Sequence, residues 1–116
     1  MTSTFEQRLP RRLALDCDYG AEPVWGLSDD GTTYLVGVDP LPVSEDLKRD
    51  LRVWGARFLD IAYPPDRRSE IDKSVWDVFV GAGGELAERL QLELGPEVEV
   101  VYRLASKYRE WTEPEI

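Results

Sequence analysis

The stretch that most constrains the fold is an amphipathic helix predicted from Ser44 to Ala62. Its large apolar side chains recur at steps of four, three, four and three residues, which aligns them on one face of an α-helix. These side chains are Leu47, Leu51, Trp54, Phe58 and Ile61. Ser44 stands at the N-cap position, and Glu45 and Asp46 place negative charge in the first turn. A face that carries Trp and Phe needs an apolar surface to cover, so we expect this helix to close the core.

Three strands are predicted before this helix. Apolar and polar residues alternate from Leu13 to Tyr19, which is the period of a half-buried strand with Cys17 inward and Asp16 and Asp18 outward. Two short apolar runs follow at residues 24–27 and 32–38. The Asp30-Gly31 pair between them is typical of a hairpin turn. We therefore expect a hairpin in front of the helix.

A second helix and a last strand are predicted after a proline-containing loop at residues 63–68. The helix runs from about Ile71 to Leu94, and Gly95-Pro96 is a plausible stop. Its predicted apolar face consists of Val75, Val78, Phe79, Ala82, Leu86, Leu90 and Leu94. The three glycines between Gly81 and Gly84 each cost about 1 kcal/mol relative to Ala, which leaves open a kink or two shorter helices. Alternation from Val98 to Leu104 predicts the last strand.

These elements predict an α+β fold of order β-β-β-α-α-β. We expect a two-layer sandwich in which two helices cover one face of a three- to four-stranded, mainly antiparallel sheet. The length of 116 residues fits one domain, here residues 13–104, with a basic arm at 1–12 and an acidic tail at 105–116. A cytoplasmic location is expected because there is no signal-like or membrane-spanning apolar run and only one cysteine.

The residues that carry common catalytic chemistry are scarce. The chain has no histidine, which removes the commonest general base and most zinc sites, and Cys17 has no basic neighbour to activate it. Asp16 and Asp18 would need further oxygen ligands to hold a divalent cation, and the glycines at 81–84 depart from phosphate-binding loops. We predict no catalytic residue, metal or cofactor. A small-molecule or metal-binding protein, or an enzyme using carboxylates in a pocket between sheet and helices, is the alternative.

The net charge of -9 points instead to protein interaction. The span from Leu13 to Leu47 has eight acidic side chains and no basic one, which serves solubility or the docking of a basic partner. The predicted partner-binding residues are Asp16, Asp18, Glu22, Asp29 and Asp30, with Trp111 as an anchor. Nucleic acid is not expected as a partner, because the net negative charge repels its phosphate groups. No membrane is expected either, because no apolar run approaches the length of a membrane span. A homodimer through a strand edge or Trp76 stays open.

Three segments resemble a group of small uncharacterised actinobacterial proteins. They are LALDCDYGAEPVW at residues 13–25, LPVSEDLKRDLRVWGARF at 41–58 and ELAERLQLELGPEVEVVYR at 85–103. Similar small acidic proteins are often encoded beside toxins as immunity proteins. Together with the acidic segment from Leu13 to Leu47 and the missing catalytic chemistry, this leads us to predict a non-enzymatic interaction module, of the immunity or antitoxin type, that inhibits a basic partner such as a toxin. The resemblance carries no established activity. It supplies no catalytic residues.

Overall fold

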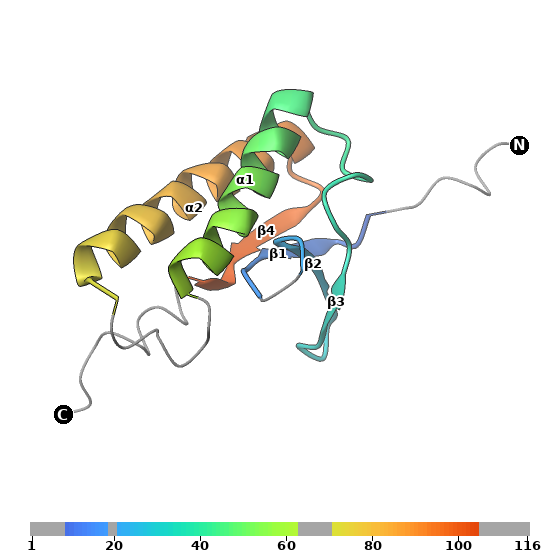
Figure 1. Cartoon of the computed structure of the whole chain (residues 1–116). Helices are drawn as coiled ribbons and strands as arrows, with labels where there is room; N and C mark the ends of the chain where they lie inside the picture. Colours follow the sequence, from blue (N-terminus) through green and yellow to red (C-terminus); the bar gives the residue numbers. More distant parts are fainter. Residues whose placement is uncertain (1–8, 19–20, 63–70, 105–116) are drawn as a thin grey trace, which may run out of the picture.

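A computed structural model describes residues 9–18, 21–62 and 71–104 of the chain. Its elements, in order, are β1 (Arg12–Leu15), β2 (Val24–Leu27), β3 (Thr33–Leu35), α1 (Glu45–Ala62), α2 (Lys73–Leu94) and β4 (Glu99–Tyr102) (Figure 1). The predicted order β-β-β-α-α-β is confirmed. The predicted loop at residues 63–68, most of the arm, and the tail with Trp111 lie outside the described residues.

The four strands form one sheet in the order β3-β2-β1-β4. β2 pairs antiparallel with β1 and with β3, whereas β4 lies parallel to β1. Both helices lie on the same face of this sheet, as Figure 1 shows. The α+β prediction is therefore confirmed, with a mixed sheet. The parallel pairing follows from the crossover through α1 and α2, which returns the chain to the far side of β1.

The first helix packs as its sequence predicts. All five side chains of the predicted stripe are buried in the core: Leu47, Leu51, Trp54, Phe58 and Ile61. The backbone N–H of Leu47 donates to the hydroxyl oxygen of Ser44 at 3.2 Å, which satisfies one of the free donors at the helix start. Ser44 in turn donates through its N–H and its hydroxyl to the Glu93 carboxylate at the end of α2. The cap therefore also joins the two helices.

The second helix is continuous through Gly81–Gly84, and its buried face differs from the predicted one. Its buried residues are Trp76, Phe79, Gly83, Leu86, Ala87 and Leu90. The predicted face was wrong for Val75 and Val78, which are exposed. The face is led by Trp76, whose indole contacts Phe58 and Phe79, so Trp76 is not available as an exposed dimer anchor.

A close approach around Gly83 explains why the glycine run is compatible with a continuous helix. Trp54 stacks on Phe79 with ring centroids 4.9 Å apart and donates its indole N–H to the Phe79 carbonyl at 2.9 Å. The Tyr102 hydroxyl donates to the Val80 carbonyl at 2.6 Å, and burial raises the pKa of this hydroxyl, which keeps it protonated. A Cβ at Gly83 would overlap both the Trp54 ring and the Tyr102 hydroxyl. The missing side chain is what lets α1, α2 and β4 meet.

We predict that Gly83→Ala lowers the free energy of unfolding by about 1–3 kcal/mol, because the added methyl group forces the two rings apart. Gly81→Ala is the matched control on the same helix, since a Cβ there has no neighbour within 4 Å. It should raise stability by about 0.5–1 kcal/mol through helix propensity alone. Urea unfolding of both variants provides the measurement. Equal effects of the two substitutions would contradict the packing role of Gly83.

Candidate partner-binding surface

The helix-free face of the sheet carries the side chains that alternate with the core. The register aligns Ala14 with Trp25 and Trp25 with Leu35, so these three residues lie on the face opposite Leu13 and Leu15. The Trp25 indole N–H donates to the Asp16 carbonyl at 3.2 Å, so the ring reaches along β1. Ala14 is buried as well, and the prediction of a half-buried first strand was wrong. The inward position of Cys17 is confirmed, because its side chain is buried in the core.

Asp16 and Asp18 come together on this face. Both line a cavity of about 150 Å³ that also includes Trp25 and Arg103. Asp16 is only 8% exposed, and its carboxylate accepts the backbone N–H of Cys17 at 2.9 Å. Asp18 is exposed. Asp16 therefore contributes mainly to local structure and to the field of the cavity, whereas Asp18 is accessible to a partner.

Asp29 and Asp30 lie at the tip of the β2–β3 hairpin and are exposed. The turn is closed by the Ser28 N–H, which donates to the Thr32 carbonyl at 2.9 Å, and Gly31 takes the left-handed conformation that the predicted turn requires. The Asp30 carboxylate accepts the N–H and the hydroxyl of Thr32, and these bonds lower its pKa. Asp30 therefore carries its full negative charge at neutral pH.

The predicted acidic residues do not form one patch. β1 and β2 are antiparallel, so the hairpin tip after β2 lies at the end where β1 begins. Asp16 and Asp18 follow the other end of β1. Asp29 and Asp30 therefore lie near the start of β1, whereas Asp16 and Asp18 line a cavity that also includes Thr33 of β3 but neither Asp29 nor Asp30.

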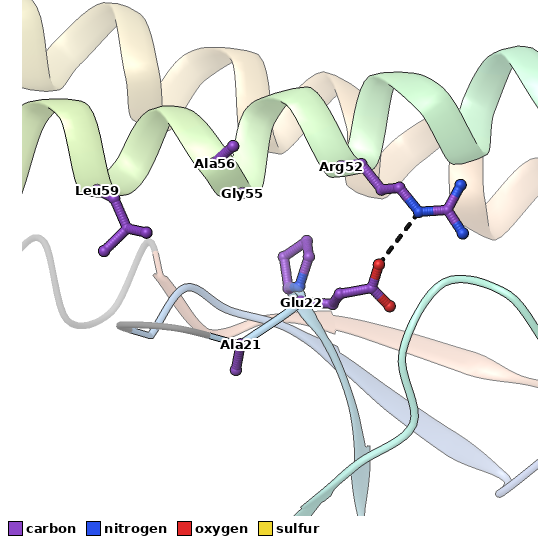
Figure 2. A pocket seen from close by; sticks show the side chains of 7 residues that line it. Ala21, Glu22, Arg52, Gly55, Ala56 and Leu59 are labelled. Atoms are coloured by element: carbon purple, nitrogen blue, oxygen red, sulfur yellow. Dashed lines mark hydrogen bonds and ion pairs between the residues drawn. The ribbon is translucent and has the colours of Figure 1, made fainter.

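Glu22 occupies a third place, beside α1. Its carboxylate accepts the Val38 N–H at 2.9 Å and pairs with the Arg52 guanidinium at 3.1 Å, as the dashed line in Figure 2 shows. Arg52 also pairs with Asp39, and these two carboxylates raise the pKa of its guanidinium, with the Glu22 bond the largest cause. Arg52 of α1 therefore pairs with two carboxylates of the acidic segment. Glu22 and Asp39 are partly neutralised within the chain.

An open groove of about 350 Å³ lies next to this ion pair (Figure 2). Its lining residues are Ala21, Glu22, Pro23, Arg52, Gly55, Ala56 and Leu59. The groove runs between α1 and the β1–β2 connection, at the margin of the helix-sheet interface, whereas buried apolar residues fill that interface. Among the described residues, no group of three or more His, Cys, Asp or Glu side chains is placed to hold a metal ion.

The outer face of α2 is a surface that the sequence interpretation missed. Val78 is 73% and Leu92 is 82% exposed, and Glu85 and Glu88 lie between them on the same side of the helix. Neither glutamate forms an ion pair within the described part of the chain. The sequence could have indicated the exposed face of α2 indirectly, through the opposite, buried face. That buried face shows helical spacing once a glycine is accepted in it, and it comprises Trp76, Phe79, Gly83, Leu86 and Leu90.

Residues 11–105 match the family model described as Serratia CdiI immunity protein-like. The chain belongs to this family. The match runs from just before β1 past the end of β4, so it includes every element of the fold. No curated protein matches the chain significantly. The family supports the immunity-type role that the sequence predicts. None of the described helices is long and apolar enough to cross a membrane.

An ion pair between α1 and α2 makes the free energy of unfolding depend on the charge of one acidic side chain, that of Asp50. Arg89 on α2 donates to the Asp50 carboxylate on α1 at 2.8 Å. This bond is the largest cause that lowers the pKa of Asp50, and Arg49 adds to it. A carboxyl with a lowered pKa in the folded state stabilises the fold above its unfolded pKa of about 3.9, and this stabilisation disappears as the pH falls through the folded value.

We therefore predict that Asp50→Asn destabilises the protein most at neutral pH. The difference in free energy of unfolding between the wild type and the variant should shrink as the pH falls below about 4, where the wild-type carboxyl becomes protonated. Chemical unfolding at a series of pH values measures this difference. Asp60→Asn is the control, because Asp60 forms no ion pair within the described residues. A difference for Asp50→Asn that is independent of pH would refute the ion-pair contribution.

Proposed function

We propose that this protein is an immunity protein that binds a toxin and blocks its activity, and that the surface it covers on the toxin is basic. The observation that carries the proposal is the match to the immunity-protein-like family over residues 11–105. The net charge of -9 supports a basic partner, because a strongly acidic protein attracts a basic one over a long range.

The contacts we propose begin with Asp29 and Asp30. Both are exposed at the hairpin tip, and neither forms an ion pair within the described part of the chain. Asp18 and Asp16 would act from the other end of β1, and Glu22 from beside Arg52. Trp111 remains our proposed anchor in the tail, outside the described residues. At the hairpin tip a partner displaces no ion pair of the described residues, whereas at Glu22 it meets the pair with Arg52.

Co-expression tests the function directly. The proteins encoded next to the gene of this chain are each produced in a bacterial host, with and without the chain. We expect one of them to arrest growth alone and to be tolerated when the chain is present, and the two to co-purify. An inactive variant of that toxin shows that the arrest is specific. The proposal fails if no neighbouring protein is toxic, or if toxicity persists at equal expression of the chain.

Asp29→Asn with Asp30→Asn should slow association with this toxin by about tenfold in low salt, because long-range attraction is lost while Asn keeps an acceptor for Thr32. The wild-type rate should also fall steeply between about 0.02 and 0.5 M salt, and less steeply for the variant. Glu85→Gln with Glu88→Gln on α2 is the control with the same change of net charge. Stopped-flow mixing gives the rates. Equal slowing by both pairs would assign the effect to net charge and not to the hairpin tip.

A further inference from the structure

The two edge strands of the sheet differ in whether their outward-pointing backbone groups form hydrogen bonds. β4 forms one edge of the sheet, and there the side chain of Gln91 forms hydrogen bonds with backbone groups of this strand and of the residue before it. Its amide accepts the Val100 N–H at 2.9 Å and donates to the Val98 carbonyl at 2.7 Å. The Glu99 N–H, next along the strand, donates toward β1 at the Arg11 carbonyl. Gln91 therefore covers groups that point away from the sheet, where an added strand would pair.

β3 forms the other edge, and no strand of the described residues lies against its outer side. The Ser28 N–H donates to the Thr32 carbonyl, and the Val36 N–H donates to the Val24 carbonyl. Antiparallel pairing alternates, so the N–H and C=O of Thr33 and Leu35 point away from β2. All three residues of β3 are exposed. This edge therefore offers a short row of backbone donors and acceptors to another chain.

The side chains of this edge offer apolar contacts on both faces. Tyr34 is 48% exposed and its ring lies over Gly26, on the face that carries the helices. Leu35 is 54% exposed and lies beside Trp25 on the helix-free face. Exposed edges are commonly protected by lysine or proline, and here no basic residue occurs from Leu13 to Leu47. Within the described residues, only its shortness protects this edge.

We propose that the β3 edge is the docking site for an extended basic segment of the toxin, which would add a strand to the sheet. This inference rests on the proposed function. Backbone hydrogen bonds to Thr33 and Leu35 would provide the pairing, and Tyr34 and Leu35 the apolar contacts. Asp29 and Asp30 lie at one end of this strand, where they would meet basic side chains of the added segment.

A second copy of the chain fits this edge poorly. In an antiparallel pair of β3 strands centred on Tyr34, Asp29 of one copy would lie opposite Asp39 of the other, and Asp30 opposite Val38. Arg52 of the same copy pairs with Asp39 and offsets part of this repulsion, and the net charge of -9 on each copy adds repulsion at longer range. A basic strand has the complementary charge.

Leu35→Lys tests the site, with the toxin from the neighbouring gene, in an inactive form, as the probe. A lysine on the edge repels a basic segment and blocks strand addition, so we expect the dissociation constant to rise by about tenfold or more in titration calorimetry. Leu92→Lys is the matched control, because it places the same charge at an exposed leucine on α2, and it should change the constant by less than about threefold. If Leu35→Lys melts at a lower temperature than the wild type, Thr33→Lys is used in its place.

Amide hydrogen exchange tests the pairing itself. The N–H groups of Thr33 and Leu35 should become protected when the toxin binds, whereas the exposed face of α2 should not change. Equal weakening by Leu35→Lys and Leu92→Lys, or protection confined to α2, overturns the docking site while leaving the inhibitor role intact. Protection that rises with the concentration of the chain alone, together with a dimer in sedimentation, assigns the edge to a second copy. Absence of any binding by the wild type refutes the proposed function itself.

Discussion

The contact of Trp54 with α2 is the interaction on which the arrangement of the layers depends. Its ring lies against Phe79 and against the position where Gly83 has no side chain, and Tyr102 reaches the same place from β4. One indole therefore fixes the approach of both helices to the last strand. Because Gly83 is what permits this approach, the helix-propensity cost of the glycine run is offset by tertiary packing. Through Tyr102, the same contact also joins β4, which forms one edge of the sheet, to the two helices.

Much of the fold could be predicted from periodicity alone. The stripe of α1, its Ser44 cap, the span of β2 and the Asp30-Gly31 turn follow from local rules that tertiary packing did not override. The face of α2 was misplaced because a glycine does not register as apolar, so Val75 and Val78 were counted in place of Trp76 and Gly83. The burial of Ala14 and the parallel pairing of β4 depend on contacts between distant segments, which periodicity does not contain.

The acidic segment illustrates a similar limit for the surface. Eight acidic residues from Leu13 to Leu47 form one block in sequence, yet the fold divides them between two ends of the sheet and the side of α1. Lys48 and Arg52, which end the block, turn back to the Asp39 backbone and to the Glu22 carboxylate. The order of charges along the chain therefore predicts that the surface is negative overall, but not where on the surface the acidic side chains lie. The hairpin tip keeps its charge because no cation of the described residues reaches it.

An open sheet edge is ordinarily an aggregation hazard, and the charge of this chain bears on that hazard as much as on partner choice. The Gln91 side chain forms hydrogen bonds with the backbone at the β4 edge, whereas in the described part of the chain the β3 edge has no such cover and is protected by its shortness and nearby carboxylates. With a net charge of -9, two copies repel one another at long range. The same field attracts a basic chain. On the proposed function, the same charge would therefore favour a basic partner at this edge over a second copy of the chain.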